Sequence, residues 1–189
     1  ALLLKGGIML GLKMKEHLHL ITLAAGVAVA ETVHSLYGYR PLLKWPNDIM
    51  GADRKIGGIL TESRFKGTDP ALLVIGIGLN LVHFTLQGEM FSKAASLSEF
   101  IREPLSREQL LISLTRSLLN WICTIEPEGV ISRWCSWSST LGRLVEVIND
   151  GFRVVGIAKS IDHLGRLVVT PEGSNDSLVI ASGSLLYVG

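Results

Sequence analysis

Two lysines and two adjacent glycines form the part of the sequence best suited to chemistry. Lys44 and Lys55 flank a loop that carries a carboxylate, Asp48, and the second lysine is followed by Gly57 and Gly58. If both lysines end neighbouring strands, their ammonium groups converge on one point, and glycines inside a strand let a ligand approach the backbone closely. Such an arrangement suits a phosphate and a carboxylate held side by side. The carboxylate of Asp48 could also bind Mg²⁺ carried in by a nucleotide.

A second interpretation of this stretch stays open at this point. A hairpin with solvated charges and a Pro-Asn-Asp turn at residues 46–48 would need no ligand. The surrounding pattern predicts strands at residues 42–45 and 56–61, joined as a hairpin with a long loop. It predicts a further strand at residues 72–81. Because that run is almost wholly apolar, we expect both of its faces to be covered.

Three helices are predicted from apolar periodicity and capping residues. Apolar residues recur with a helical period over residues 17–36, and Gly38 follows as a C-terminal cap. A Ser-x-x-Gln capping pattern at residues 106–109 precedes a second helix, whose apolar face runs over residues 110–125. A shorter helix is expected at residues 129–134.

From residue 140 onwards the sequence consists of short β-rich runs separated by turn residues. The runs are residues 144–148, 152–157, 167–170, 178–180 and 185–188. Several short strands joined by tight turns within about fifty residues indicate a small barrel or sandwich. We therefore place a domain boundary near residue 140.

The composition fits a globular protein with a core. Of the 189 residues, 48% are hydrophobic and 19% are charged, and the formal net charge of +1 predicts no nucleic-acid partner for this segment. The longest apolar stretch, residues 20–30, is about half of what a bilayer crossing needs, so no membrane association is expected. Cys123 and Cys135 lack metal-ligand spacing, and we expect both to be core residues of a cytoplasmic protein.

The motifs resemble those of biotin–protein ligases. The stretch KWPNDIM…RKIGGILTES, beginning at Lys44, is similar to the KWPND and KxxGIL motifs that this family carries at the same separation. Residues 74–81 are similar to the family's GIGIN segment, and residues 24–31 resemble the helix that precedes KWPND. Residues 141–183 resemble its C-terminal SH3-like barrel, with a GxAxxIDxxGxL pattern at residues 156–167. The resemblance covers essentially the whole chain.

The resemblance implies a role for each candidate site residue. Three are expected to be catalytic: Lys55 would contact biotin and the adenylate phosphate, Asp48 would help with the metal or the incoming amine, and Lys44 is a second phosphate-binding candidate. Asn80 would hydrogen-bond the adenine edge. The other expected cofactor-binding residues are Asn47, Gly57, Gly58, Gly76 and Gly78. The first glycine pair would border the biotin rings, and the second would let the nucleotide lie against the strand.

The family also implies a fold and a reaction. Residues 1–139 would form an α+β catalytic domain, a mixed β-sheet flanked by helices as in class II aminoacyl-tRNA synthetases, and residues 140–189 would form the SH3-like barrel. Biotin and Mg·ATP would give biotinyl-5′-AMP, which then biotinylates a lysine of the biotin carboxyl carrier protein of acetyl-CoA carboxylase. No Ser/His/Asp or Cys/His constellation is required, because no covalent enzyme intermediate forms. A homodimer is a further expectation from the family.

The sequence departs from the family at two places. The Ser/Thr-Asn segment and the GRGRxGR loop of the family have no counterpart, and residues 1–4 resemble the strand that follows that loop. We therefore expect a catalytic domain without its N-terminal portion, with poor adenylate retention and little ligation by the isolated chain. Ser184 and Val188 stand where many relatives carry an acidic residue and an arginine. This difference leaves a nucleotide contact from the C-terminal domain in question.

Three alternatives to a biotin ligase remain at the level of sequence. A lipoate or octanoate ligase shares the acyl-adenylate chemistry, although KWPND and the C-terminal barrel favour biotin. A bifunctional ligase and repressor would carry its DNA-binding domain outside this segment. A non-catalytic biotin-binding remnant would keep the cleft but lose the reaction.

Overall fold

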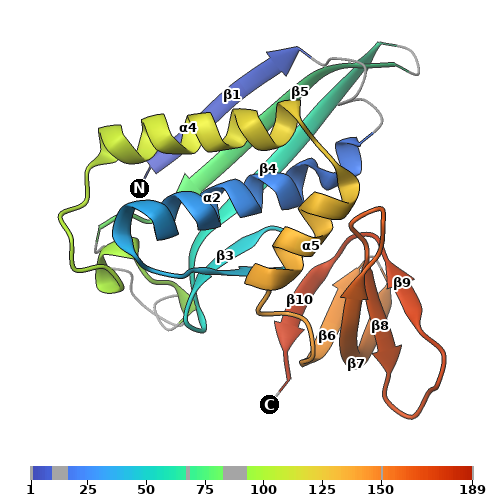
Figure 1. Cartoon of the computed structure of the whole chain (residues 1–189). Helices are drawn as coiled ribbons and strands as arrows, with labels where there is room; N and C mark the ends of the chain where they lie inside the picture. The colour runs from blue at the N-terminus through green and yellow to red at the C-terminus, as the bar shows by residue number, and fades with distance from the viewer. Residues whose placement is uncertain (1, 10–16, 67–68, 83–92, 150, 189) are drawn as a thin grey trace.

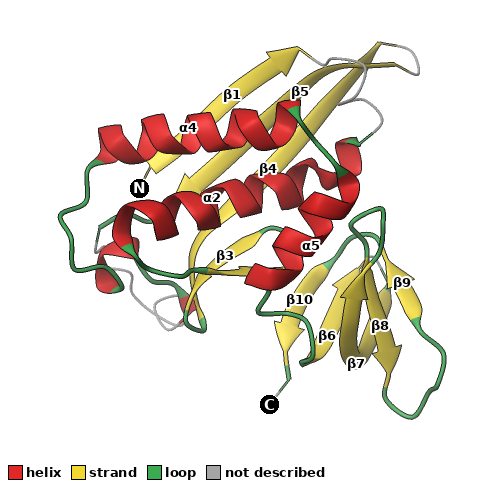
Figure 2. Ribbon diagram, viewed as in Figure 1, coloured by secondary structure: helices red, strands yellow, loops and turns green. Residues whose placement is uncertain are grey.

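The computed structural model describes residues 2–9, 17–66, 69–82, 93–149 and 151–188 (Figure 1). The strands of the first sheet are β1 (Leu2–Met9), β2 (Leu42–Lys44), β3 (Asp48–Gly51), β4 (Arg54–Lys66) and β5 (Asp69–Leu79). The helical segments are η1 (Leu18–Leu20), α2 (Ile21–Tyr37), η2 (Leu97–Glu99), α4 (Arg107–Cys123) and α5 (Pro127–Trp137). The strands of the second sheet are β6 (Leu144–Asn149), β7 (Phe152–Ile161), β8 (Leu167–Pro171), β9 (Leu178–Ile180) and β10 (Ser184–Tyr187). The architecture is α+β, as the sequence predicts (Figure 2).

The first sheet has the strand order β1-β5-β4-β3-β2, and every pairing between its strands is antiparallel. In the described part of the chain, the parallel pairing expected of a mixed sheet is limited to two isolated bridges, Leu43–Ser138 and Lys55–Ala94. The reason is the short connections from β2 to β5, since neighbours in an antiparallel sheet need only a tight turn, whereas parallel neighbours need a long crossover.

The loop predicted between two hairpin strands contains a strand of its own. Residues 46–48 were expected to stop the first strand and start a turn, but Asp48 begins β3, which pairs with β2 on one side and β4 on the other. Ile49 and Met50 explain the difference, because both are buried and so favour extended backbone packed against the sheet over an exposed loop. This meander brings Lys44 opposite Asp48 in the register of β2 and β3.

One face of the first sheet is covered by α2, α4 and α5 (Figure 1). The side chains of β5 that are buried on this face alternate along the strand: Leu73, Ile75, Ile77 and Leu79. Between them Val74, Gly76 and Gly78 are only partly buried. The expectation that residues 72–81 are covered on both faces is therefore wrong, because alternate positions carry glycine and face an open side.

Helix α2 is the core helix of the first sheet's domain. It begins within the predicted residues 17–36, and Gly38 ends it in the left-handed conformation at φ 65°, as expected of a C-terminal cap. With η1 it forms the described helix Leu18–Tyr37, which by length and composition is long and apolar enough to cross a membrane, although most of it is buried. Its alanine and valine side chains pack inside the fold, as in the core helix of a globular domain.

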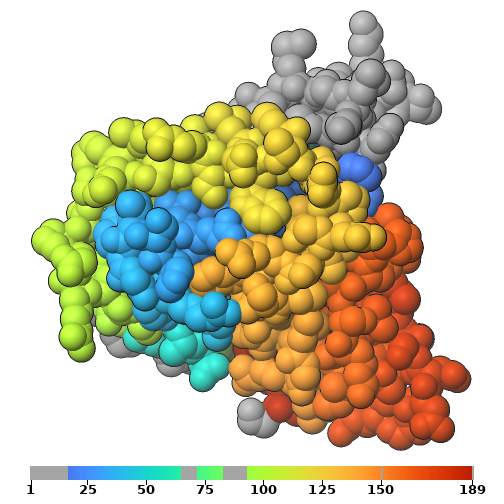
Figure 3. Space-filling view, in the orientation of Figure 1, coloured from blue at the N-terminus to red at the C-terminus, as the bar shows by residue number. Residues whose placement is uncertain are grey.

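Helices α4 and α5 pack beside α2 and complete the helical layer (Figure 3). The hydroxyl of Ser106 accepts a hydrogen bond from the backbone N–H of Gln109 at 3.2 Å, so the predicted N-terminal cap of α4 is confirmed. The prediction that both cysteines are core residues is wrong. Cys123 ends α4 on its exposed side, and Cys135 is partly buried in α5.

The second sheet has the order β10-β6-β7-β8-β9, again with antiparallel pairings. It lies against α5 and the β2 end of the first sheet (Figure 1). Trp45 joins the two sheets: its backbone N–H donates to the hydroxyl of Thr140, and its indole N–H donates to the carbonyl of Gly165 at 3.2 Å. Trp45 is 2% exposed and is part of the core.

Candidate functional site

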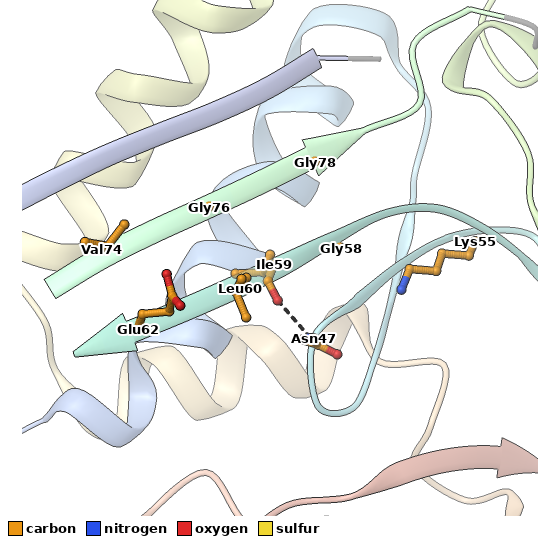
Figure 4. Close-up of a pocket in the computed structure, with 9 residues that line it drawn as sticks. All are labelled: Asn47, Lys55, Gly58, Ile59, Leu60, Glu62, Val74, Gly76 and Gly78. Carbon is orange, nitrogen blue, oxygen red and sulfur yellow. Dashed lines mark hydrogen bonds between the residues drawn. The ribbon is translucent and has the colours of Figure 1, made fainter. Parts of the chain in front are cut away.

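A cleft of about 400 Å³ lies on the face of the first sheet that the helices leave uncovered. The residues that line it come from the β2–β3 connection, β4 and β5: Asn47, Lys55, Gly58, Ile59, Leu60, Glu62, Val74, Gly76 and Gly78. Lys55 and Asn47 lie at one end of the cleft, and Glu62 and Val74 lie at the other (Figure 4). Five of the nine predicted site residues thus meet in one cavity.

Three glycines leave the floor of this cleft free of side chains. Gly58 on β4 pairs with Gly78 on β5, and Gly76 pairs with Leu60. A Cβ built at Gly76 or Gly78 would meet no atom closer than 3.7 Å, so no packing contact demands glycine there. Their absence of side chains instead exposes the backbone to whatever occupies the cleft.

Gly57 lies on the opposite face of the sheet from Gly58. A Cβ at Gly57 would stand 2.5 Å from the carbonyl oxygen of Gly78 and 2.6 Å from a methyl group of Leu79, which is buried under the helices. Close packing therefore accounts for this glycine. Gly57 does not line the cleft, because adjacent strand residues point to opposite faces. The prediction that Gly57 and Gly58 border a ligand therefore stays a prediction for Gly58 alone.

The charged groups of the site form a connected cluster at one end of the cleft. The ammonium of Lys55 makes an ion pair with the carboxylate of Asp48. Burial lowers the pKa of Lys44, Asp48 acts in the opposite direction, and the cations of Lys55 and Arg143 lower it further. Lys44 is thus a desolvated cation beside other cations. It would gain from an anion placed among them.

Asn47 and Asn80 both use their side-chain amides to fix the backbone around the cluster. The Asn47 amide donates to the carbonyl of Ile59 at 2.8 Å. The Asn80 amide donates to the carbonyl of Ala95 at 3.1 Å, and the N–H of Ala95 donates to the carbonyl of Lys55 at 2.9 Å. Asn80 does not line the cleft, although it follows Gly76 and Gly78 in the same alternation just beyond β5. Ala95 therefore joins Lys55 and Asn80 at one end of the site.

Four cleft residues were not predicted: Ile59, Leu60, Glu62 and Val74. A signal for three of them exists in the sequence, since Leu60 and Glu62 follow Gly58 at strand spacing and Val74 precedes Gly76 in the same way. Leu60 is 61% exposed, which is unusual for a leucine in a central strand and marks the uncovered face.

Two further residues near the cluster were also missed. Arg143 and Tyr187 come from the second sheet's part of the chain and contact Lys44 or its neighbours. The sequence offers no local signal for them, because about a hundred residues or more separate them from Lys44.

A magnesium ion would find limited protein ligation here. Within the described ranges, no group of three or more His, Cys, Asp or Glu side chains is placed to hold a metal ion. Asp48 offers a carboxylate that already pairs with Lys55. Mg²⁺ that arrives with a nucleotide is usually held by one or two carboxylates and the substrate phosphates, so one carboxylate at this position fits a nucleotide-borne ion.

Comparison with known proteins gives consistent matches by sequence. Residues 9–80 match the biotin/lipoate A/B protein ligase family. The chain is 30% identical over 156 residues to the bifunctional ligase/repressor BirA of Escherichia coli, covering 81% of this chain and 49% of the relative. It is 31% identical over 176 residues to the biotin–[acetyl-CoA-carboxylase] ligase of Mycobacterium tuberculosis, covering 89% of this chain and 62% of the relative. The chain therefore spans only about half to three-fifths of the length of these relatives.

The fold has matches among solved structures. The biotin protein ligase from Aquifex aeolicus superimposes with a TM-score of 0.82 at 22% identity, over 98% of this chain and 82% of that chain. A structure of the ligase from Aquifex aeolicus in complex with biotin and ATP gives a TM-score of 0.81 at 21% identity, over 98% and 79% of the two chains. At this identity the likeness concerns the fold, and it confirms the expected fold class.

Proposed function

Because the chain belongs to the biotin/lipoate A/B protein ligase family, we propose that it acts in the ATP-dependent biotinylation of a carrier-protein lysine. In the first step the biotin carboxylate attacks the α-phosphorus of ATP, which gives biotinyl-5′-AMP and releases pyrophosphate. In the second step the ε-amine of the carrier lysine attacks the acyl carbon of this mixed anhydride. An amide bond forms and AMP leaves.

The observation that carries the proposal is the position of Lys55. Its side chain is 48% exposed at the end of the glycine-floored cleft, and a Cβ at Gly58 would lie 3.3 Å from its Nζ atom. A carboxylate and a phosphate that lie on this glycine floor would both come within reach of the ammonium. A fixed cation at that point stabilises the negative charge that builds on the α-phosphate as the biotin carboxylate attacks.

The lining of the cleft changes in chemistry from one end to the other. The end with Lys55 carries the charged cluster, whereas the other end combines the apolar side chains of Leu60 and Val74 with the carboxylate of Glu62 (Figure 4). We assign the biotin rings to the surface beside Gly58 and the nucleotide to the strand at Gly76 and Gly78. A cleft of about 400 Å³ is within the range of small-molecule sites.

Lys44 and Asp48 are assigned supporting roles at the charged end. Lys44 is a second phosphate-binding cation, and its desolvation strengthens its attraction for an anion. Asp48 would hold a Mg²⁺ ion that enters with ATP, or would orient the incoming lysine amine. When bound, the ion would neutralise part of the phosphate charge. Asn80 is assigned to the adenine edge, which would require its amide to leave Ala95 or to use its oxygen.

The wider parts of the proposal follow from the family. We assign residues 1–139 to the ligase domain and residues 140–189 to the SH3-like barrel. The acceptor would be a biotin carboxyl carrier protein in the cytoplasm. The curated relative from Mycobacterium tuberculosis is named for acetyl-CoA carboxylase, and this supports that choice of acceptor.

The direct test compares Lys55→Met with Lys159→Met. Both changes remove one exposed lysine charge, but Lys159 lies on β7, away from the cleft. Calorimetry would measure biotin and ATP binding, and release of labelled pyrophosphate would measure the first step. We expect Lys55→Met to lower pyrophosphate release by about 100- to 1,000-fold, the usual effect of losing one group that stabilises developing charge. Lys159→Met should match the unchanged protein.

Two results would count against the proposal. If the unchanged chain binds neither biotin nor ATP, the assignment of the cleft is wrong. If Lys55→Met and Lys159→Met release pyrophosphate at equal rates, Lys55 has no part in the first step. The cleft would then be a cavity without the proposed reaction.

A further inference from the structure

The ring of Tyr187 lies beside two cations where the two sheets meet. The guanidinium carbon of Arg143 is 3.7 Å from the ring centroid, and the Nζ atom of Lys44 is 4.9 Å from it. The tyrosine hydroxyl shares a 2.8 Å hydrogen bond with the hydroxyl of Ser139. The three groups come from β10, the segment before β6, and β2. A side chain of the second sheet thus contacts a site residue of the first.

The cations around this ring need a stabilising neighbour. Lys44 faces the positive charges of Lys55 and Arg143, and Asp48 already makes an ion pair with Lys55. Asp53 pairs with Arg143 at 3.3 Å, but Asp53 is highly exposed and this pair is screened by solvent. An aromatic face attracts a cation without a full opposing charge, so it can hold Lys44 and still leave that cation available to an anion.

The contact also links Tyr187 to the cleft in a short series of steps. Tyr187 contacts Lys44, Lys44 lies opposite Asp48 in the β2–β3 register, and Asp48 pairs with Lys55 at the end of the cleft. We propose that Tyr187 is a positioning residue whose ring holds the Lys44 ammonium beside Asp48, so that the second sheet helps to determine how the cleft binds the phosphates of a nucleotide. This inference rests on the proposed function of the cleft.

The first experiment is a double-mutant cycle on ATP binding. Tyr187→Leu removes the aromatic face, Tyr187→Phe keeps it and removes only the hydroxyl, and Lys44→Met removes the cation. We expect Tyr187→Leu to weaken ATP binding about tenfold, which corresponds to about 1.4 kcal/mol and lies within the range of partly buried cation–π contacts. Tyr187→Phe should bind nearly as the unchanged protein does. In the Lys44→Met background, Tyr187→Leu should have almost no further effect.

A purely structural role for Tyr187 gives a different pattern. Tyr187→Leu would then weaken the binding of biotin and of ATP together. It would also weaken ATP binding in the Lys44→Met background. Tyr187→Phe would weaken ATP binding as well, because the hydrogen bond to Ser139 is lost. Any of these results overturns the proposal. Leu186→Ala is the matched control, since Leu186 is the neighbouring residue on β10 and is 46% exposed. It should leave ATP binding unchanged.

The second experiment needs no ligand. With ¹³C-methylated lysines, the Lys44 signal should be displaced by the ring current of Tyr187. The displacement should disappear in Tyr187→Leu and remain in Tyr187→Phe. An unchanged Lys44 signal in Tyr187→Leu would show that the ring does not hold this lysine. If ATP fails to bind to the unchanged chain while the Lys44 signal responds as expected, the contact is real, but the proposed nucleotide site is wrong.

Discussion

The two faces of the first sheet are made by the same strands and have opposite compositions. On the covered face, β5 presents Leu73, Ile75, Ile77 and Leu79, each at most 2% exposed beneath the helices. On the uncovered face, the residues between them are Val74, Gly76 and Gly78, which line a cleft (Figure 4). β4 continues both patterns, with Ile59 at 3% and Leu60 at 61% exposure.

This difference teaches how one strand can serve stability and binding together. Because successive side chains point to opposite faces, every second residue of a strand can pack in the core while the residues between them form a ligand-binding surface. Glycine is unfavourable inside a strand, since it has no side chain to pack and loses much conformational freedom. The covered face must offset that cost. We therefore expect substitutions on the two faces to separate stability from binding.

The largest effect is expected from truncation on the covered face. Ile77→Ala removes a side chain that is 1% exposed and leaves a cavity, so it should lower the free energy of unfolding by about 2–5 kcal/mol. Val74→Ala, on the same strand but in the cleft, should cost no more than about 1 kcal/mol. Urea denaturation of both variants measures the difference. Equal losses would mean that the two faces contribute alike to stability, and the comparison would fail.

A smaller effect is expected from adding one methyl group at each of two adjacent glycines. Gly57→Ala places a Cβ 2.5 Å from the carbonyl oxygen of Gly78, so we expect it to lower the free energy of unfolding by about 1–3 kcal/mol. Gly58→Ala meets the flexible end of Lys55 at 3.3 Å and the carbonyl oxygen of Asn47 at an ordinary contact distance of 3.7 Å, so it should change stability by about 0.5 kcal/mol or less.

The binding of biotin and ATP should show the reverse order. Gly58→Ala narrows the cleft directly and should weaken binding, whereas any Gly57→Ala protein that remains folded should bind nearly as before. Thermal unfolding and calorimetry on the same two variants decide the point. If Gly57→Ala loses binding at temperatures where it is fully folded, the covered face also shapes the ligand surface.

Sequence reasoning predicted the helix caps and the short C-terminal strands well, for physical reasons that are visible in particular residues. The C-terminal cap at Gly38, the N-terminal cap at Ser106 and the run of short strands after residue 140 depend on neighbours in the chain. The strand β3 was missed because its turn-like start, Asn47 and Asp48, outweighed the two apolar residues that follow.

Other features could not be predicted because they depend on contacts between distant parts of the chain. The sequence cannot say that Gly57 packs against Gly78 while its neighbour Gly58 faces a cleft, since that depends on which side the helices cover. The contact of Tyr187 with Lys44 depends on how the second sheet lies against the first. Both features follow from tertiary packing, and neither leaves a periodic pattern in the sequence.

The smallest effect on stability is expected at residues 95–99, which contact the backbone of Lys55 through Ala95. Glu99 completes a capping box: the backbone N–H of Ser96 donates to it at 2.7 Å, and this bond lowers the pKa of Glu99, helped by Arg54 at 2.7 Å. Because the folded-state pKa lies below the unfolded value, the charged form adds stability above about pH 4.5, and this contribution is lost as the pH falls through the lower folded-state pKa.

Glu99→Gln should therefore lower the local stability of this segment near neutral pH. It should also remove most of the change in that stability between neutral and acidic pH. The amide of Ala95, which donates to the carbonyl of Lys55, reports on the segment by hydrogen exchange, corrected for the intrinsic effect of pH. In the unchanged protein its protection should fall on acidification sooner than that of Ile77 in the core. Glu62→Gln, in the cleft but outside the capping box, is the control and should leave Ala95 protection as it was. Equal protection of Ala95 and Ile77 at every pH would show that the segment around Ala95 opens only when the core unfolds. The two faces of the sheet would then differ in composition but not in local stability.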